Sequence, residues 1–405
     1  MNVAIIGAGP SGLMAAEVLS NAGYAPTVFD AKPSAGRKFL QAGKGGLNLT
    51  YDEDLSLFCS RYFEATPFLQ PALKAFSSID IRLWAQELGF ETFVGSSGKV
   101  YPKDKKAAPL LRAWIHRLKK NKTLFKMKHK LVSFSSNTWQ FDTPNGQKEY
   151  QFDGVILALG GASWPLLGST GSWAKVLEEK GLNLAPFKPS NMGFNITWSE
   201  VFKEKFSGVP LKNVTLSVRD INAKTHSQLG ELLISEYGVE GSLIYTYSKY
   251  IREQLEQTTP FVVHLDLFPH RSLEELTQQL SSKREKQSLS GFWKRLKIDG
   301  AKASLLREAV SKEQLGDAML IAKTLKEFPL SLESCRPLKE AISTAGGLEF
   351  INLDENLMLK KFEGVFCAGE MLDWETCTGG YLLTAVMAQG KQAAHGLIGL
   401  LEKKK

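Results

Sequence analysis

The sequence has little cysteine, and its cysteines lack the spacing of a disulfide framework or of a metal site. Four occur in 405 residues, none forms a C-x-x-C pair, and none has a histidine close by. We therefore expect no disulfide scaffold and no bound metal. The six histidines are scattered without ligand spacing, so none is assigned a catalytic role. The thiols, expected to be packed or reactive, are Cys59, Cys335, Cys367 and Cys377.

Long apolar runs are also absent. No stretch approaches the roughly 18 residues that a membrane span needs. Residues 1–7 carry no charged segment and reach glycine too soon for a signal peptide. We therefore expect no membrane partner and a cytoplasmic location. With 43% hydrophobic and 23% charged residues, the composition is typical of a globular protein of two or three domains, which excludes a disordered chain or a fibre.

Charge is unevenly distributed along the chain. Lys and Arg number 50 against 42 acids, which gives a net charge of +8. Residues 99–130 hold twelve basic residues and one acid, Asp104, so this segment carries +11 and the remaining residues about −3. Such an asymmetry indicates either a phosphate or nucleic-acid site or a solvated helix face.

The chain begins with a βαβ pattern around a glycine motif. Gly7-Ala8-Gly9-Pro10-Ser11-Gly12 fits G-x-G-x-x-G between a strand expected at 2–6 and a helix expected at 11–22. In such a motif the first glycine permits a tight turn, the second lets a pyrophosphate approach, and the third lets helix and strand pack closely. Asp30, 18 residues after Gly12, ends the next strand, where a carboxylate accepts hydrogen bonds from a ribose and repels a 2′-phosphate. The pattern predicts NAD or FAD.

The C-terminal region favours FAD. An apolar strand ends at Ala368-Gly369-Glu370, and Gly379-Gly380 opens a helix expected to reach about Leu401. Glu370 is placed to accept a ribityl hydroxyl, and the positive end of the helix dipole stabilises an anionic reduced flavin. A second G-x-G-x-x-G with its own acid is missing, so no dedicated NAD(P)H domain is expected.

Other segments between these motifs give further expectations. Residues 32–52 form a polar, glycine-rich run that we interpret as a functional loop. Helices are expected at 55–88 and 107–119, and a turn at Asn145-Gly146 joins two strands. In residues 214–218 and 261–267 apolar and polar side chains alternate, which is typical of strands, and residues 272–327 have a helical composition.

Several motifs together resemble the BaiN/RdsA family of FAD-dependent oxidoreductases, end to end. The resemblance implies a glutathione-reductase-type Rossmann FAD domain with a β-barrel-like domain and a helical one. It also implies reactions that reduce activated C=C bonds, among them uridine to dihydrouridine in ribosomal RNA. The segments that carry it are Gly36-Arg37-Lys38-Phe39-Leu40, 43–50, Gly160-Gly161-Ala162-Ser163-Trp164-Pro165, 168–171, 230–233, Tyr237-Gly238, 369–373 and 378–381.

From these patterns we expect an α/β + β protein with three domains. The FAD-binding domain is predicted at 1–186 and 340–405, the β-barrel-like middle domain at 187–270 and about 328–339, and a helical subdomain at 271–327.

One departure from the family concerns the loop expected near the isoalloxazine. Many relatives read Gly-Gly-Gly-Arg-Cys-Asn there, whereas this chain has Gly46 and Leu47 at the Arg and Cys positions. A thiol can donate a proton or act as a nucleophile and leucine cannot, so we expect a divergent subgroup.

Three residues are candidates for catalysis, each with an alternative. Lys44 tunes the flavin or is a flexible surface lysine, Asn48 bonds the flavin edge or caps a turn, and Trp164 covers the flavin or substrate or lies in the core. Arg37 is expected on the pyrophosphate, with packing as the alternative. The predicted cofactor-binding residues are Gly7, Gly9, Pro10, Ser11, Gly12, Asp30, Ala31, Lys32, Arg37, Lys38, Gly45, Asn48, Leu131, Ala158, Gly160, Gly161, Gly369, Glu370, Gly379, Gly380 and Tyr381.

The function predicted is that of an enzyme with non-covalent FAD, to which NAD(P)H gives a hydride that passes to an unsaturated organic acceptor. A second hypothesis makes RNA the substrate, with residues 99–130 holding phosphates and a base extruded to the flavin. A third is a flavin-containing redox-sensing module without turnover.

Overall fold

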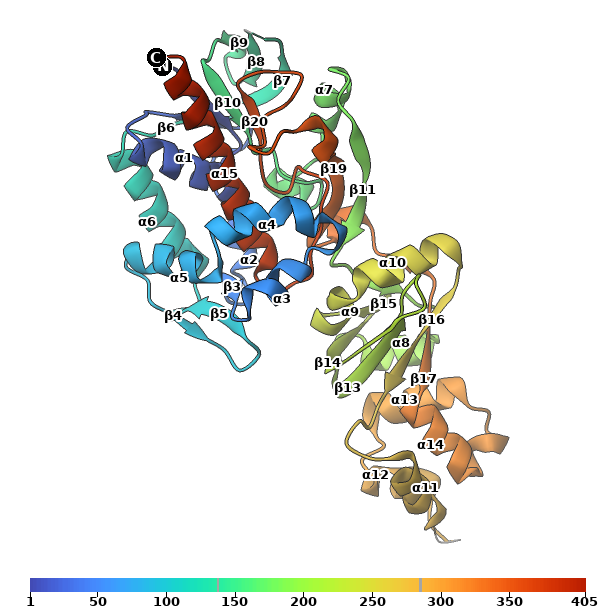
Figure 1. Ribbon diagram of the computed structural model, residues 1–405. Coiled ribbons are helices and arrows are strands. Elements are labelled where there is room, and N and C mark those ends of the chain that lie inside the picture. Colours follow the sequence, from blue (N-terminus) through green and yellow to red (C-terminus); the bar gives the residue numbers. More distant parts are fainter. Residues whose placement is uncertain (137, 284–285) are drawn as a thin grey trace. The chain divides into compact units, whose positions relative to one another are not determined.

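The computed structural model describes residues 1–136, 138–283 and 286–405 (Figure 1). The chain divides into two compact units, one of residues 1–190 with 338–405 and one of residues 191–337. The predicted division into three domains stays a prediction.

A five-stranded parallel sheet forms the centre of the first unit. Its order is β20-β10-β1-β2-β6, and every neighbouring pair runs parallel. The strands expected from the sequence at its centre are confirmed and are buried along their length. The sheet consists of β1 (Val3–Ile6), β2 (Thr27–Asp30), β6 (Leu124–Met127), β10 (Gly154–Leu157) and β20 (Val365–Cys367).

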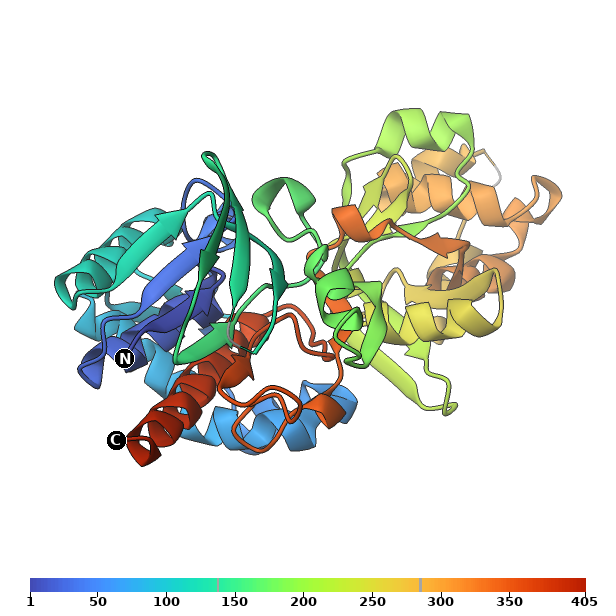
Figure 2. The ribbon, with the colours of Figure 1, turned by 90° about the horizontal axis from the view of Figure 1, so that it is seen from above.

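Helices α1 (Pro10–Asn21) and α15 (Tyr381–Lys403) pack side by side, and α15 also contacts β10 and β20 (Figures 1 and 2). Gly390 permits this packing, because a Cβ there would lie 2.2 Å from the carbonyl oxygen of Ser11. The C-terminal helix therefore completes the N-terminal βαβ unit.

Helix α6 (Ala107–Lys120) also packs against α1 and confirms the helix expected at 107–119. Its buried residues follow helical spacing, with basic residues around them, and Ile115, which the same spacing places on this stripe, is half-buried. The buried residues are Ala107, Leu110, Leu111, Trp114 and Leu118.

A three-stranded meander covers β2. It contacts the sheet through Phe29, whose ring stacks on Phe141 with a centroid distance of 4.7 Å. The turn expected at Asn145-Gly146 is confirmed, since it joins the second and third strands. The meander consists of β7 (Lys130–Phe134), β8 (Trp139–Thr143) and β9 (Gly146–Tyr150).

The run at 32–52 is not loop throughout, because it contains helix α2 (Arg37–Ala42). Gly36 begins this helix in the left-handed region, with φ of 66°, and Phe39 is its buried residue. The helical region expected at 55–88 is confirmed and consists of three helices and a 3-10 turn. The other elements of this unit are β3 (Thr50–Tyr51), α3 (Leu55–Ser60), α4 (Thr66–Ala75), α5 (Ser78–Glu87), β4 (Thr92–Val94), β5 (Lys99–Pro102), α7 (Trp173–Glu178), β11 (Leu184–Ser190) and β19 (Ser343–Leu348), with 3-10 turns at Phe63–Ala65, Pro165–Leu167, Leu338–Glu340 and Phe350–Asn352.

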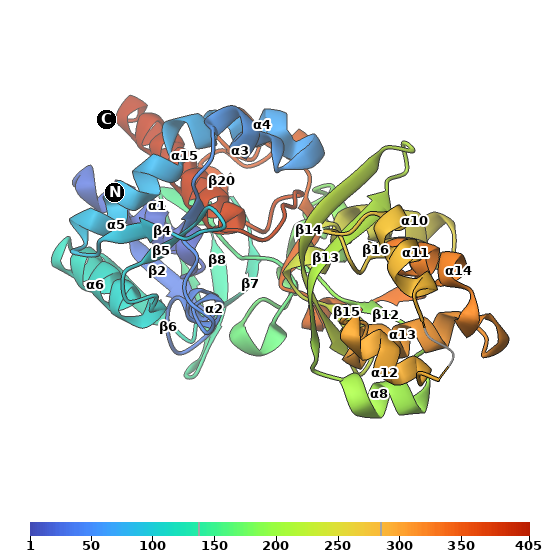
Figure 3. The same ribbon diagram turned by 90° about the horizontal axis from the view of Figure 1, so that it is seen from below.

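The second unit combines a seven-stranded sheet, of order β17-β16-β13-β14-β15-β12-β18, with helices. Helices α13 and α14 pack against β17. Helix α11 packs on α14 (Figure 3). The strands expected at 214–218 and 261–267 and the helices at 272–327 are confirmed. Its elements are β12 (Phe194–Asn195), α8 (Glu200–Phe206), β13 (Pro210–Arg219), β14 (Thr225–Ser235), β15 (Gly238–Glu240), α9 (Ser242–Thr246), α10 (Ser248–Gln257), β16 (Phe261–Asp266), α11 (Leu273–Ser281), α12 (Leu289–Arg295), α13 (Gly300–Ala309), α14 (Ala318–Lys326), β17 (Phe328–Leu332) and β18 (Ser334–Cys335), with a 3-10 turn at Glu313–Gly316.

Candidate functional site

The glycine loop between β1 and α1 has the local structure that its motif predicts. Gly7 has φ of 116°, and a Cβ there would lie 2.0 Å from the carbonyl oxygen of Ala158, while a Cβ at Gly12 would lie 1.9 Å from the carbonyl oxygen of Gly7. A Cβ at Gly9 would meet nothing within 4 Å. Gly9 is also the N-cap of α1 and provides no side-chain acceptor to the first N–H groups. The loop is therefore tight on its protein side and open above Gly9, as an anion site requires.

Asp30 ends β2 and fastens this loop. One carboxylate oxygen accepts the N–H of Ala8 at 2.8 Å and the other accepts the N–H of Lys32 at 2.7 Å. Burial raises the pKa of Asp30, and these two N–H bonds oppose the rise. A carboxylate has about four acceptor positions, so two are left for a ligand such as a ribose. The role of Asp30 toward a ribose stays a prediction.

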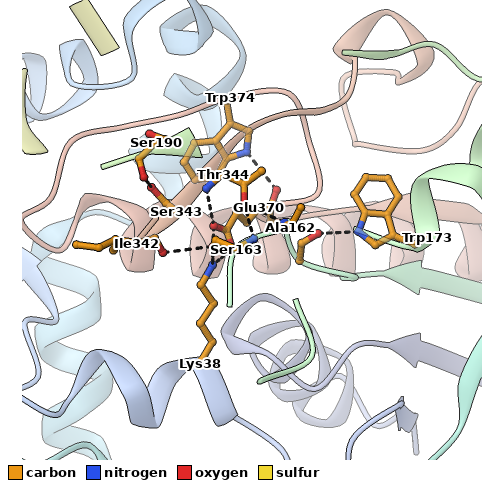
Figure 4. Close-up of polar contacts among 12 residues, drawn as sticks. Lys38, Ala162, Ser163, Trp173, Ser190, Ile342, Ser343, Thr344, Glu370 and Trp374 are labelled. Atoms are coloured by element: carbon orange, nitrogen blue, oxygen red, sulfur yellow. Dashed lines mark hydrogen bonds and ion pairs between the residues drawn. The ribbon is translucent and has the colours of Figure 1, made fainter. Parts of the chain in front are cut away.

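A polar cluster joins Lys38 to Glu370 across the carboxyl edge of the sheet (Figure 4). The Lys38 ammonium donates to both carboxylate oxygens of Glu370, at 2.7 and 2.6 Å, and to Ser163 Oγ at 2.9 Å. The Glu370 residue is 7% exposed and the Lys38 side chain 25%. The two were predicted separately as cofactor-binding residues, and the ion pair between them was not.

The loop after β10 and strand β19 complete this cluster. Thr344 Oγ1 accepts the N–H groups of Ala162 and Ser163, at 2.9 and 3.0 Å, and the Thr344 N–H donates to Glu370 at 3.2 Å. A Cβ on Gly161 would lie 2.5 Å from Thr344 Oγ1 and 3.1 Å from Glu370 Cδ. Gly161 is therefore required for this close approach.

Ser163 and Thr344 were not predicted as site residues. Each lies two residues from a glycine pair, Gly160-Gly161 and Gly346-Gly347 respectively, and that proximity is the signal that could have identified them.

Helix α15 begins at a second glycine pair. Gly379 and Gly380 have φ of 139° and 95°, and a Cβ on Gly380 would lie 2.5 Å from Thr50 Cα. Gly380 is the N-cap and no side chain caps the first turn. The 23-residue helix thus presents a positive dipole end beside β3.

Tyr381, the first residue of α15, has its hydroxyl directed to another part of the site. The hydroxyl donates to Glu53 at 2.8 Å, and Glu53 forms an ion pair with Arg61 at 2.7 Å. Tyr62 donates to the carbonyl oxygen of Tyr381 at 2.8 Å. Burial and the hydrogen bond to Glu53 raise the pKa of Tyr381. These contacts hold the first turn of α15, and the predicted contact of Tyr381 with a cofactor stays a prediction.

Three predicted cofactor residues have buried polar atoms that lack a hydrogen-bond partner. These atoms are Ser11 Oγ, Arg37 Nε and Asn48 Oδ1. Native interiors satisfy nearly all such atoms, so these three are available for hydrogen bonds to a ligand. Together with the open space above Gly9 and the uncapped ends of α1 and α15, these residues fit a bound dinucleotide.

The catalytic candidates have different surroundings. Lys44 is exposed. Asn48 is half-buried, and its Oδ1 caps no turn. Trp164 is half-buried in the left-handed region, with φ of 60°, so the alternative of a core tryptophan is wrong. Leu47, at the position of the relatives' cysteine, is fully buried. No other thiol replaces that cysteine in the described part of this loop.

Other predicted residues are dispersed around the sheet edge. Leu131 lies on β7 and is buried, Ala31 is exposed after β2, and Gly45 is exposed. The Lys32 stem lies 2.9 Å from where a Cβ on Gly168 would be.

The four cysteines are free. Cys59 and Cys367 are buried, so for these two thiols the structure favours the packed alternative over the reactive one. Burial raises the pKa of Cys377 to about 11, and that of Cys335 likewise to about 11. A thiol with so high a pKa is a poor nucleophile at neutral pH.

The basic segment 99–130 is only partly available to a ligand. Arg117 forms an ion pair with the buried Glu17, Lys103 pairs with Glu91, and the Lys126 ammonium lies 4.3 Å from the Tyr150 ring centroid. The basic residues of the segment that are exposed and outside those contacts are Lys105, Lys106, Arg112, Lys119, Lys120, Lys122, Lys128 and Lys130.

In the described ranges, no helix is both long and apolar enough to cross a bilayer. Nor do the described residues include a group of three or more His, Cys, Asp or Glu side chains that could hold a metal ion.

Comparison with known proteins gives a family match over nearly the whole chain. The family described as HI0933-like protein Rossmann domain matches residues 1–396. A 3-dehydro-bile acid delta(4,6)-reductase of Clostridium scindens is 25% identical over 401 residues, 96% of this chain and 97% of the relative. A ribosomal RNA dihydrouridine synthase of Haemophilus influenzae is 24% identical over 389 residues, 93% of each chain.

Solved structures resemble the fold. A flavocytochrome c3 fumarate reductase in its open conformation aligns with a TM-score of 0.51 at 14% identity, over 98% of this chain and 78% of its own. A 3-ketosteroid-delta4-(5alpha)-dehydrogenase from Rhodococcus jostii RHA1 gives 0.50 at 13% identity, over 98% and 96%. At these identities the likeness concerns the fold alone.

Proposed function

The chain belongs to the HI0933-like Rossmann family, and from this premise we propose that it reduces an electron-poor carbon–carbon double bond of an organic acceptor. As a member of this family the protein is an FAD-dependent oxidoreductase, and the resemblance to the BaiN/RdsA family is confirmed. The observation that carries the proposal is the open glycine loop at the carboxyl edge of the parallel sheet, which has open space above Gly9 and an unpartnered, buried Ser11 hydroxyl.

The residues that would hold FAD come from both ends of the chain. The N–H groups at the start of α1 and the Arg37 guanidinium would bind the pyrophosphate, and Asp30 the ribose. Glu370 has one acceptor position left for a ribityl hydroxyl. When bound, FAD supplies the capacity to accept and donate a hydride.

The chain's own residues contribute orientation and electrostatics. The uncapped N-terminus of α15, held by Gly379 and Gly380, stabilises negative charge that develops next to it. Lys44, Asn48 and Trp164 remain the candidates for contact with substrate. Because Leu47 replaces the thiol of many relatives, a proton donor must come from another side chain or from water.

NAD(P)H is the reductant that we propose. The second dinucleotide fingerprint is missing from the sequence, so the nicotinamide cofactor would bind transiently rather than in a domain of its own. The reductase name of the Clostridium scindens relative supports an acceptor with an activated double bond.

Steady-state turnover tests this proposal. Purified protein is mixed with NADH or NADPH and an α,β-unsaturated ketone, and the product is examined by mass spectrometry. We expect consumption of the reductant and an acceptor heavier by two hydrogens. If no such product forms with a panel of unsaturated ketones, the proposal is contradicted. If the protein turns over none of the acceptors tried, the redox-sensing module is favoured.

A matched pair of glycine variants tests the cofactor site. Gly9 has φ of −80°, which any L-residue adopts, and both Gly9 and Gly399 leave open space for a Cβ. We expect Gly9→Ala to fold and to bind FAD at least tenfold more weakly, because its methyl group occupies the space of the pyrophosphate. Gly399→Ala, in α15, is expected to bind FAD normally. Equal binding by both would contradict the placement of FAD.

RNA is a second candidate substrate, favoured by the exposed basic residues of segment 99–130 and by the name of the Haemophilus influenzae relative. Phosphate contacts predict an affinity that falls steeply with salt. We expect Lys119→Gln/Lys120→Gln/Lys122→Gln to weaken RNA binding and flatten that slope. Unchanged affinity, or affinity that does not fall with salt, would exclude RNA.

A further inference from the structure

We propose that Lys38 is a positioning residue that neutralises Glu370 at the carboxyl edge of the sheet and so sets how readily FAD is reduced there. The inference rests on the proposed function, because it assumes that FAD binds at this edge. It assigns to the Lys38–Glu370 ion pair an electrostatic role that neither residue has alone.

The hydrogen bonds of the pair are nearly saturated. All three N–H groups of the Lys38 ammonium have acceptors, namely the two oxygens of Glu370 and Ser163 Oγ. Glu370 also accepts the N–H of Thr344, so one of its acceptor positions remains. The carboxylate is therefore held in one orientation by Lys38 of α2 and Thr344 of β19, and Ser163 in the loop after β10 holds the ammonium.

Because the pair is largely buried, water screens a change in its net charge only in part. Glu370 is nearly enclosed, and only part of Lys38 reaches solvent. Breaking a buried pair by removing one partner leaves an uncompensated charge in a medium of low dielectric. A single substitution therefore changes the charge of this edge by one unit that water does not fully screen.

The location of the pair connects it to the glycine loop. Glu370 follows Gly369, where a Cβ would lie 2.9 Å from Ser11 Cβ, and Ser11 belongs to the first turn of α1. A Cβ on Gly161, in the loop after β10, would lie 3.1 Å from Glu370 Cδ. In open α/β sheets, ligands bind outside the carboxyl ends of the strands, which is where the pair lies.

Removing the positive charge of the pair and removing its negative charge are expected to shift the midpoint potential of FAD in opposite directions. Lys38→Met leaves the carboxylate uncompensated and disfavours a cofactor that gains negative charge, so the midpoint potential falls. Glu370→Gln leaves the ammonium uncompensated, so the potential rises. The double variant has no net charge and returns near the wild-type value. Loss of packing alone gives neither opposite signs nor this restoration.

The experiment is anaerobic reduction of the FAD-loaded proteins against a reference dye. We expect each single variant to change the reduction equilibrium about tenfold, which is about 30 mV for a two-electron couple. Lys38→Arg keeps the charge and is expected to stay near wild type. Lys148→Met removes an exposed lysine on β9 and is the matched control, expected to leave the potential unchanged.

Two failures are distinguishable. A wild-type protein that binds no FAD contradicts the proposed function. A wild-type protein that binds FAD, with both single variants shifting the same way or not at all, overturns the role of Lys38. Lys38→Gln, which keeps hydrogen-bond donors, is measured in parallel. If Lys38→Met does not fold, the potentials of Lys38→Gln and Glu370→Gln are compared instead, and they are again expected to shift in opposite directions.

Discussion

Two buried glutamates of the first unit, Glu17 and Glu370, are alike in burial and differ in surroundings. They are 6% and 7% exposed, and each pairs with one basic side chain. Glu17, on α1, accepts hydrogen bonds from the indole N–H groups of Trp84 and Trp114 and from Arg117. Glu370 accepts from Lys38 and from a backbone N–H, next to glycines of the sheet edge.

The difference teaches that a buried ion pair does not by itself mark a functional site. Glu17 even borders a cavity of about 570 Å³ lined by α1, α5 and α15. However, the donors of Glu17 come from large side chains that join α1 to α5 and α6, as a structural contact requires. The surroundings of Glu370 include Gly161, Gly369 and the unpartnered hydroxyl of Ser11. An unpartnered atom does not separate the two sites, because Arg117 Nε beside Glu17 also lacks a hydrogen-bond partner. The close backbone approach at Gly161 and Gly369 is what distinguishes the binding edge.

The largest effect is expected for Glu17→Ala. It leaves Arg117 and two buried indole N–H groups without their acceptor, and should lower the free energy of unfolding by about 3 kcal/mol. Urea denaturation checks this. Glu87→Ala, which removes an exposed carboxylate 3.8 Å from Arg117, is the control and should cost less than about 0.5 kcal/mol. Equal losses would show that Glu17 is not the structural anchor.

Thr344→Val should cost about 2 kcal/mol, since the buried N–H groups of Ala162 and Ser163 lose their acceptor. The same unfolding measurement tests it, with Thr344→Ser as the variant that keeps the hydroxyl. If serine were as destabilising as valine, the methyl group rather than the hydrogen bonds would hold the loop.

Glu370→Ala separates the two glutamates by function. We expect FAD binding at least tenfold weaker, about 1.4 kcal/mol, because the last acceptor position for the cofactor is lost. Titration followed by flavin fluorescence measures it. Glu17→Ala, assayed at a temperature where it is folded, should bind FAD like wild type, and a similar loss in both variants would remove the distinction.

The smallest effect concerns pH. Burial raises the pKa of Glu17 above its ordinary value of 4.5, although Arg117 opposes the rise. The folded state therefore binds this proton more tightly than the unfolded state, and the stability that the proton provides is lost as pH rises above 4.5. Glu17→Gln removes this dependence, so its thermal midpoint relative to wild type should increase between pH 5 and pH 7. A constant difference would contradict the raised pKa.

Local patterns in the sequence predicted much of the first unit. The glycine loop, Asp30 and the stripe on α6 are each contained in a short segment, where backbone geometry and periodicity act directly. Helix α2 was missed because Phe39 is its one buried residue, so its six residues show no stripe. The Lys38–Glu370 pair spans 332 residues, and no spacing rule reaches so far. The half-buried position of Trp164 likewise depends on the tertiary fold.

The central claim is tested most directly by mixing the protein anaerobically with NADH or NADPH and recording absorbance near 450 nm. The account predicts a yellow protein whose absorbance bleaches rapidly with one of the two reductants and returns when an unsaturated acceptor is added. A colourless protein that FAD cannot reconstitute, or a yellow one that neither reductant bleaches, would contradict it.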